Sequence, residues 1–415
     1  MHRDNWASEG GRSLQTATRG QHRPTPRWNA TSKSKDRDRA PTTYRSSRWS
    51  PLMHVLITQP YIPAYRVPLF SRVSELLDQV GVRLTIAAGA PGAIQAKRGD
   101  LSTVSGFIPM QERKVLLGQR QIMLRRASFA PKPDLIVSEL EALNLFAWDA
   151  VLRKRPVVLW GHGKSYVNHP SRIGDRIEWA LARRSERVMT YSASGRQYLI
   201  ERGKLDPSSV VAIGNSTDTV ALRSDLLALD AEDFQRTRRL VGTGTRALFV
   251  GGLDKSKRID FLIESAIHAR RLDPSFKLII VGKGELEPIV KTAATNGAPV
   301  VHVPVARGRE LARLAAVSGA VWMPGRVGLV AVDALAFGLP VHTTDFGFHA
   351  PEVEFLEGEE VLYLENDPQS FAENSLNHSV PTFDSGDRGL REEIPTIQSV
   401  ASAFAKVVTD ALAHI

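Results

Sequence analysis

The chain has 415 residues, 42% of them apolar, which is long enough for two domains of ordinary size. It has no cysteine, which excludes disulfides, zinc–thiolate sites and thiol nucleophiles and suits a reducing compartment. The net charge of +10 comes mostly from residues 1–50, where 11 Lys/Arg accompany 4 Asp/Glu, so only +3 remains for the other 365 residues. This distribution argues against nucleic-acid binding by the folded part. No apolar run approaches the ~20 residues of a membrane span, and no signal-peptide core begins the chain.

Residues 1–52 predict a disordered basic tail, because they are rich in Arg, Ser, Thr, Pro and Gly and have no apolar periodicity. An over-long gene start before the strand at Met53 is one alternative. A basic arm that touches anionic lipid or polymer is another. The one Asp-x-Asp pair of the chain, Asp36 and Asp38, lies in this tail, away from any strand end where it would hold a metal ion for a transferase.

Strand and helix patterns alternate from Met53 onward. Apolar strands are predicted at 53–58, 82–88, 133–139, 155–163 and 186–192, helices at about 67–80, 140–152 and 171–184, and the segments 194–203 and 208–216 follow. Such alternation predicts a parallel sheet covered on both faces. The segment Arg113–Phe129 interleaves cations with apolar residues, so we expect a solvated helix packed on the sheet, with a basic helix on a membrane surface as the alternative.

Residues 226–244 have weak periodicity and mixed charge, which predicts a linker. A more regular series follows, with strands at 247–251, 276–281, 299–305, 320–323, 340–344 and 361–367 and helices at 258–271, 285–295, 308–317, 328–337, 368–375 and 396–413. We therefore expect an α/β protein of two Rossmann-like, doubly wound domains, 53–225 and 245–395, facing a central cleft, with a C-terminal helix at 396–415. Ligands bind at the carboxyl ends of such sheets.

The stretch Ala320–Thr344 has the pattern of an anion site: a buried strand, a Pro-Gly turn and a helix start. The turn lets a phosphate approach unpaired N–H groups at the positive end of the helix dipole. Asp333 is close enough to the same helix end to accept hydrogen bonds from sugar hydroxyls. This pattern predicts the donor-binding element of a nucleotide-sugar enzyme.

Three other loops that follow predicted strands contain residues that could contact the donor. Gly251 and Gly252 allow close approach of the backbone, and Lys257 at the next helix start can reach a diphosphate. A plain turn with a solvated lysine is the alternative. Gly284 lies in a second glycine loop, which alone is more simply a βα turn, and the backbone of His302–Val305 could line a base pocket.

Taken together, these motifs resemble the group 1 (family 4) glycosyltransferases, which have the GT-B fold. The resemblance rests on GGL…K, RIDFLIESA, KLIIVGKGELEP, PGRVGLVAVDALAFGLPV, HAPEVEFL and EEVLYLEND in the second half, and more loosely on YIPAYRVPLF, PDLIVSE, RPVVLWGHG and VAIGNSTDT in the first. It implies a retaining transferase, independent of metal and cofactor, that moves a sugar from a nucleotide-diphosphate donor to a sugar or lipid-linked acceptor. Surface polysaccharide or glycolipid assembly, in the cytoplasm or at the inner face of the membrane, is the expected setting.

The expected site residues follow from the loops and from the resemblance. Catalytic roles are expected for His162, Lys257 and Asp333, acceptor contacts for Tyr65 and Arg66, and donor contacts for Gly251, Gly252, Lys257, Gly284, Val303, Gly325, Arg326, Val327, Gly328, Leu329 and Asp333. A structural role is the alternative for His162, and a surface position is the alternative for the acceptor pair. Glu139 and Glu352, near other strand ends, are weaker candidates.

The chain departs from the family at two polar positions. The family has two acids eight residues apart around the glycine turn; the second is Asp333 here, but the first position is Gly325, and Gly252 stands where the family has an arginine. Either this branch uses backbone groups and Arg326 instead, which we favour, or catalysis is impaired. A nucleotide-sugar epimerase, a non-catalytic sugar-nucleotide-binding protein and a nucleic-acid-binding tail also remain open.

Overall fold

The computed structural model describes residues 52–92, 96–97, 101–104, 107–117, 120–126, 132–166, 171–383 and 388–415, and for 112–126 the backbone alone. The tail expected at 1–52, with Asp36 and Asp38, lies outside the described residues apart from Leu52.

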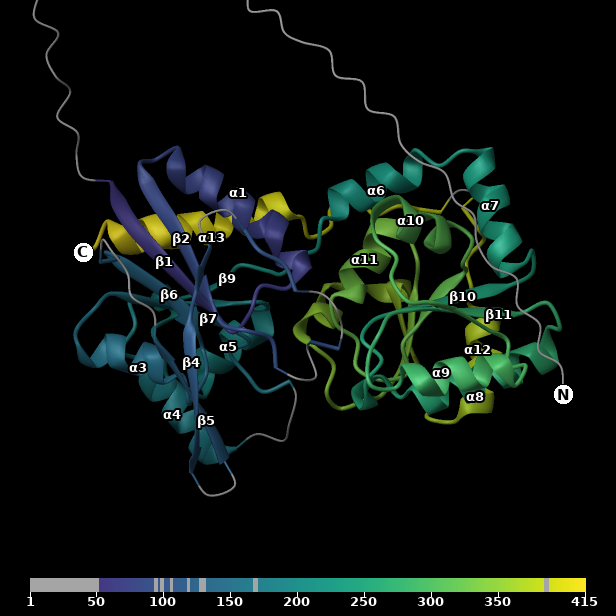
Figure 1. Ribbon diagram of the computed structural model, residues 1–415, viewed down its shortest axis with the longest axis horizontal. Coiled ribbons are helices and arrows are strands. Elements are labelled where there is room, and N and C mark those ends of the chain that lie inside the picture. Colours follow the sequence, from purple (N-terminus) through teal and green to yellow (C-terminus); the bar gives the residue numbers. More distant parts are fainter. Residues whose placement is uncertain are drawn as a thin grey trace, which may run out of the picture. The chain divides into compact units, whose positions relative to one another are not determined.

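The first sheet has seven parallel strands in the order β3-β2-β1-β6-β7-β8-β9. They are β1 (Met53–Gln59), β2 (Val82–Ala88), β3 (Phe107–Pro109), β6 (Leu135–Glu139), β7 (Val157–Gly161), β8 (Arg187–Thr190) and β9 (Val210–Ala212). Figure 1 shows helices on both faces, as the continuously apolar strands require: α1 (Val67–Asp78) and α13 (Ile397–Leu412) on one, α3 (Leu145–Leu152), α4 (Arg172–Ala182) and α5 (Ala193–Glu201) on the other.

The second sheet has six parallel strands in the order β12-β11-β10-β13-β14-β15. They are β10 (Arg246–Val250), β11 (Lys277–Val281), β12 (Val300–Val303), β13 (Ala320–Trp322), β14 (Val341–Thr344) and β15 (Val361–Leu364). The helices α6 (Thr219–Leu227), α7 (Ala231–Val241), α10 (Gly308–Ala316) and α11 (Val330–Phe337) cover one face, and α8 (Ile259–Leu272), α9 (Glu287–Thr295) and α12 (Pro368–Asn377) the other (Figure 1). The prediction of two doubly wound α/β sheets is confirmed.

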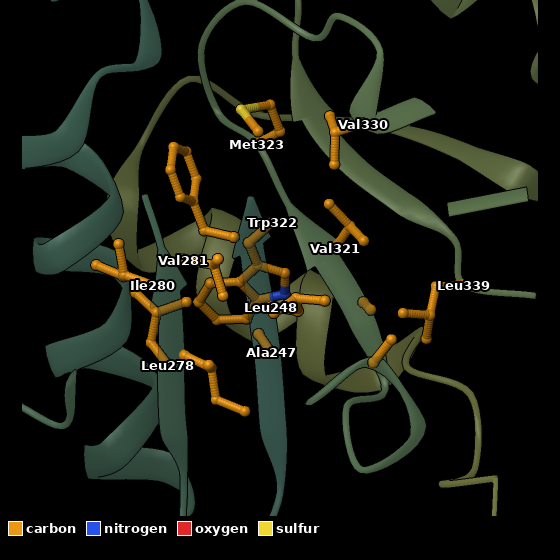
Figure 2. Packing of buried hydrophobic residues seen from close by; sticks show 14 of the residues in the cluster. Ala247, Leu248, Leu278, Ile280, Val281, Val321, Trp322, Met323, Val330 and Leu339 are labelled. Atoms are coloured by element: carbon orange, nitrogen blue, oxygen red, sulfur yellow. The ribbon is translucent and has the colours of Figure 1, made fainter. Parts of the chain in front are cut away.

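Each sheet buries a tryptophan against aromatic neighbours. Trp322 of β13 stacks on Phe276 with ring centroids 5.0 Å apart and meets Phe371 of α12 edge-on at 5.4 Å; Figure 2 shows the surrounding apolar cluster. Trp160 of β7 packs edge-on against Phe404 of α13, with centroids 5.2 Å apart. The C-terminal helix therefore completes the core of the first sheet, although the whole second sheet precedes it in the chain.

The chain passes between the sheets twice, and the two crossings are hydrogen-bonded to each other. The hydroxyls of Ser216 and Thr219 both donate to the carbonyl of Pro395, at 2.9 and 2.8 Å. The first crossing leads into α6 and the second into α13. These bonds tie the two connections to each other at one point.

The segment Arg113–Phe129 is not a helix. β4 (Gln111–Leu117) and β5 (Arg120–Arg126) form a separate antiparallel pair in which Val115 lies opposite Ile122, and residues 127–129 lie outside the described part. The apolar positions make no single helical stripe, whereas β-branched and long apolar residues suit a ladder. The predicted helix is therefore wrong, and the membrane-surface helix offered as its alternative is wrong with it.

Smaller differences concern helix starts. The helix expected at 140–152 begins only at Leu145, because the side chain of Asn144 accepts a hydrogen bond from the backbone N–H of Ala147 and caps it. Within the expected linker 226–244, α7 begins with a capping box of Asp230 and Asp233. No helix among the described residues is both long and apolar enough to cross a bilayer.

Candidate active site

Loops at the carboxyl ends of strands in both sheets line one cleft of about 610 Å³. It brings together ten of the fourteen predicted site residues: Tyr65, Arg66, His162, Gly251, Gly252, Lys257, Arg326, Gly328, Leu329 and Asp333. The other four lie outside its lining: Gly284, Val303, Gly325 and Val327.

Lys257 joins two loops of the second sheet. It ends a single 3-10 turn, η3 (Lys255–Lys257), which Asp254 caps by accepting the backbone N–H of Ser256 at 3.0 Å. The ammonium of Lys257 donates to the carbonyl of Arg326, in the turn before α11. A positive charge therefore lies beside the glycine turn, on the wall of the cleft.

The turn between β13 and α11 is held by hydrogen bonds of its main chain. The N–H of Arg326 donates to the carbonyl of Ser256 at 2.8 Å, and that of Val327 donates to Nδ1 of His349 at 3.2 Å. Since Nδ1 accepts, the ring proton lies on Nε2, which donates to the carbonyl of Thr344 at 3.0 Å. Burial lowers the pKa of His349, which favours this neutral ring. Sequence reasoning missed His349, although it stands in the quoted HAPEVEFL motif.

Val327 has no exposed surface, which explains its absence from the lining. The start of α11 faces the cleft instead, through Gly328, Leu329 and Val330. Backbone N–H groups at the start of a helix favour an anion, and anion binding at this helix start stays a prediction.

Several glycines of this wall serve close packing of backbone on backbone. A Cβ at Gly325 would overlap the carbonyl oxygen of Ser256, and a Cβ at Gly284 would overlap that of Leu253. At Gly282, with φ +150°, it would overlap the carbonyl oxygen of Gly251. The loops after β10 and β11 are therefore pressed together, and Gly284 is needed for that contact and not as part of the lining.

The lining of the cleft lies two residues further along the chain than the predicted base-pocket segment His302–Val305. Val303 is the last residue of β12 and only 9% exposed, so it belongs to the core of the sheet. The residues that follow it line the cleft instead: Pro304, Val305, Ala306 and Arg307. β12 also ends two residues earlier than the strand predicted at 299–305.

Asp333 lies in the first turn of α11, and Oδ1 accepts a hydrogen bond from the hydroxyl of Thr217 at 2.6 Å. Burial raises the pKa of this carboxyl to about 6, against the opposing effect of Thr217. Thr217 belongs to the first crossing between the sheets, in the quoted GNSTDT motif. The acid of the second sheet is therefore held from the other side of the cleft.

Arg66 is fixed by three side chains of the first sheet. Its guanidinium donates to the hydroxyl of Tyr191 at 2.7 Å, to that of Tyr65 at 3.1 Å, and to Oε1 of Gln59. It also lies 4.4 Å from the ring centroid of Trp160, a cation–π contact. These partners hold a positive charge in one place on the cleft wall.

His162 follows β7 and packs its ring against Tyr191 and Tyr166, with centroids 4.9 and 5.5 Å apart. Burial, together with the charges of Arg326 and Arg66, lowers its pKa to about 4, so the ring is neutral near pH 7. Its Nδ1 is buried without a hydrogen-bond partner among the described residues. A neutral imidazole in this position can donate a hydrogen bond to a ligand or accept one from it.

Glu352 also lines the cleft, whereas the other weaker candidate, Glu139, does not. Glu352 lies in the 3-10 helix η4 (Pro351–Phe355), and only 4% of its surface is exposed. Its Oε1 accepts a hydrogen bond from Nδ2 of Asn215 at 2.6 Å. Burial raises the pKa of this carboxyl, while Asn215, Arg326 and Arg66 act in the opposite direction.

Glu354, two residues further on, connects the second half of the chain to the first. Its Oε1 accepts from the hydroxyl of Tyr166 at 2.8 Å and from Ser194, and it pairs with the ammonium of Lys164 at 3.4 Å. Sequence reasoning missed this contact: Glu354 lies in the quoted HAPEVEFL motif, but nothing in the sequence says that it meets Tyr166, Ser194 and Lys164. The two sides of the cleft therefore also contact each other beside His162.

Comparisons with known proteins agree with this architecture. Residues 70–220 match the family model described as Glycosyltransferase Family 4, and residues 244–378 match the model described as Glycosyl transferases group 1. Together the two models cover most of the described chain. No curated protein matches the sequence.

Solved structures share the fold at low sequence identity. Sucrose-phosphate synthase from Thermosynechococcus elongatus has a TM-score of 0.60 at 16% identity, over 88% of this chain and all of that one. HepE from Anabaena, in complex with UDP and glucose, has a TM-score of 0.58 at 15% identity, over 86% of this chain and 100% of that one. UDP-GlcNAc 2-epimerase from Methanocaldococcus jannaschii, in complex with UDP-GlcNAc and UDP, has 0.55 at 12%, over 86% and 99%.

The two sheets and the cleft define a protein of the GT-B fold. The chain belongs to the group 1, family 4 glycosyltransferases. Family membership establishes glycosyl transfer as the class of activity, and leaves the donor, the acceptor and the stereochemistry to be argued from the site.

Proposed function

We propose that the protein is a retaining glycosyltransferase that moves a sugar from a nucleotide-diphosphate donor to a hydroxyl of a sugar or lipid-linked acceptor. Assembly of a surface polysaccharide or glycolipid is the setting that family resemblance favours. The observation that carries this proposal is that Lys257, the start of α11 and Asp333 line the same cleft. A diphosphate, a ribose and the transferred sugar need those three kinds of group within reach of one another.

The leaving diphosphate gains negative charge as the glycosidic bond breaks. Fixed cations and N–H dipoles stabilise such charge most when they are already in place before the reaction. Lys257 is anchored on the carbonyl of Arg326, and Gly328 and Leu329 present the start of α11. We propose that these groups supply the positive charge, without a metal ion or a cofactor.

The two acid–base candidates then have separate tasks. Asp333 would lie at the nucleotide end of the donor and accept hydrogen bonds from ribose hydroxyls. His162, neutral near pH 7, would hydrogen-bond the transferred sugar from the opposite wall. Tyr65 and Arg66, in the loop after β1, would meet the acceptor.

Structural neighbours in complex with UDP and with UDP-sugars support a nucleotide-sugar donor. A neighbour that is an epimerase also supports a second candidate: a nucleotide-sugar epimerase of the same architecture. The absence of a side chain at Gly325, where the family has an acid, favours keeping this candidate. A third, a protein that binds sugar nucleotides without turnover, rests on the same position.

The test is to incubate the purified protein with UDP- and GDP-sugars, with and without simple glycoside acceptors, and to follow the sugar protons by NMR. We expect a new glycoside whose anomeric configuration equals that of the donor, with turnover unchanged by EDTA. Isomerised donor without a glycoside would show the epimerase. Donor binding without any product would show the non-catalytic protein, and a product of inverted configuration would refute retention.

A further inference from the structure

The family's first acid is missing at Gly325, and the backbone leaves no room for it. A Cβ there would overlap the carbonyl oxygen of Ser256 and lie less than 3 Å from backbone atoms of Lys257. The N–H of Arg326 donates to the same carbonyl of Ser256, so the two loops are bonded at this point. A carboxylate at residue 325 would need the loops to separate, and the site must therefore obtain any such group from elsewhere.

Glu352 offers a carboxylate to the same cleft from the loop after β14. It is 4% exposed and lies on the cleft wall with Arg326 and His162. A buried carboxylate is costly unless it is paired or hydrogen-bonded. Here the carboxylate accepts a hydrogen bond from Nδ2 of Asn215 at 2.6 Å, and the positive charges of Arg326 and Arg66 stabilise its ionised form.

Glu352 and His162 both line the cleft and share two charged neighbours. Arg66 and Arg326 act electrostatically on both Glu352 and His162, so the two side chains lie in one charged environment. Asp333, which we assign to the nucleotide end, is held instead by Thr217. Two carboxylates with separate hydrogen-bond partners, Asp333 and Glu352, therefore line the cleft.

We propose that Glu352 is the carboxylate that binds the transferred sugar, in place of the acid missing at Gly325. This inference rests on the proposed function. One carboxylate oxygen is oriented by Asn215, and the group accepts hydrogen bonds from sugar hydroxyls beside His162. Two residues of different loops thus share the task that the family gives to its glycine turn: residue 325 packs against the Lys257 loop, and residue 352 supplies the charge.

The alternative is that Glu352 merely ties the first crossing to η4 through Asn215. The variant Glu352→Gln separates the two roles, because the glutamine keeps an oxygen that can accept the hydrogen bond from Asn215 while the negative charge is lost. Glu359→Gln is the matched control: Glu359 is exposed, lies in the next short helix η5 (Gly358–Glu360) and is not part of the cleft lining.

The experiment compares the wild type, Glu352→Gln and Glu359→Gln in three measurements: Tm, the Kd of free UDP by titration calorimetry, and kcat with the UDP-sugar that the wild type uses. We expect the Tm of Glu352→Gln to stay within a few degrees of the wild type and its Kd for UDP to stay within about twofold. Its kcat should fall about 100-fold, the usual effect of losing one preorganised polar contact to the reacting group. The control should match the wild type in all three.

Two results would overturn the inference. One is a kcat of Glu352→Gln within a few-fold of the wild type, as expected if Glu352 only ties the loops through the hydrogen bond that the glutamine keeps. The other is a parallel loss of Tm and UDP affinity, which would show that the negative charge serves the fold of the cleft and not the transfer of the sugar. If the wild type itself binds UDP but transfers no sugar to any acceptor, the proposed function has failed and the inference falls with it; a wild type that is active with an unaffected Glu352→Gln refutes the inference alone.

Discussion

On the wall of the cleft that the first sheet supplies, side chains hold one another: Arg66 is fixed by Tyr65, Tyr191 and Gln59. On the wall of the second sheet, backbone packs directly against backbone. The loops after β10 and β11 meet at Gly251 and Gly282, with no space for a side chain between them. The difference indicates two tasks. A wall of backbone N–H groups suits a diphosphate, whose chemistry is the same in every donor, and a wall of side chains suits an acceptor that varies.

The strongest way to break the backbone wall is to add one methyl group at Gly282. In Gly282→Ala the Cβ would overlap the carbonyl oxygen of Gly251, at a φ of +150° that alanine avoids. We expect a loss of about 3 kcal/mol or more in the free energy of unfolding, from backbone strain and displaced loops. Urea unfolding measures it, and Gly347→Ala, where a Cβ meets nothing within 4 Å, is the control. Equal stability of the two variants would contradict the close packing.

A substitution on the side-chain wall should affect both the stability of the fold and the use of the acceptor. Arg66→Lys keeps the positive charge but cannot serve Tyr191, Tyr65 and Gln59 at once. We expect a loss of about 2 kcal/mol in the free energy of unfolding, since polar partners are left unpaired in a buried site. Turnover and the KM for the acceptor should worsen, while the Kd of free UDP stays unchanged. A weakened UDP Kd at constant stability would show that this wall also binds the diphosphate.

The walls also differ in their response to pH. Asp333 has a pKa of about 6 in the folded protein, above the usual value of a carboxyl because of burial. Its charge therefore destabilises the fold at neutral pH, and this cost disappears as the pH falls from above 6 to below 4. Asp333→Asn, which keeps an acceptor for Thr217, should be more stable than the wild type by about 2 kcal/mol at pH 8. The gap should close near pH 4, and the activity should be lost. A constant gap in urea unfolding at both pH values would refute the buried charge.

His162, on the other wall, should act with the opposite sign and a smaller effect. Its pKa is lowered to about 4, first by burial and then by Arg326 and Arg66. Between pH 6.5 and pH 4 the unfolded chain binds a proton on this ring, whereas the folded protein keeps the ring neutral. The free energy of unfolding therefore decreases as the pH falls through this range. Since the ring is only partly shielded from solvent, we expect about 1 kcal/mol. In His162→Gln the loss of stability between pH 7 and pH 4.5 should shrink by that amount; an unchanged loss would contradict the assignment.

The same difference explains what the sequence could predict. The backbone wall is built from loops that each join a strand to the next helix. Its glycines and charges therefore stand at recognisable places in the sequence, as at Gly251, Lys257, Gly328 and Asp333. Gly325 also stood out, but only the structure shows that packing against Ser256 forbids a side chain there. Periodicity predicted both sheets because their strands are apolar on both faces.

The side-chain wall could not be predicted in this way. Tyr191 lies in no recognised motif, and nothing in the sequence says that it bonds to Arg66 and packs on His162. No local pattern shows either that Glu352, from the second sheet, meets Asn215. The β4–β5 pair was mistaken for a helix because alternating cations and apolar residues in a short segment fit either period poorly. The return of α13 to the first sheet is likewise a property of the fold, which no local pattern expresses.

The most direct test of the account is a calorimetric titration of UDP into the wild type and into Lys257→Ala, with Arg66→Lys as the matched change on the other wall. The account predicts that Lys257→Ala weakens the Kd of UDP at least tenfold, about 1.4 kcal/mol of binding free energy, while the Tm falls by no more than a few degrees, and that Arg66→Lys leaves the Kd unchanged. A Kd unaffected by Lys257→Ala would contradict the central claim that the second sheet holds the diphosphate.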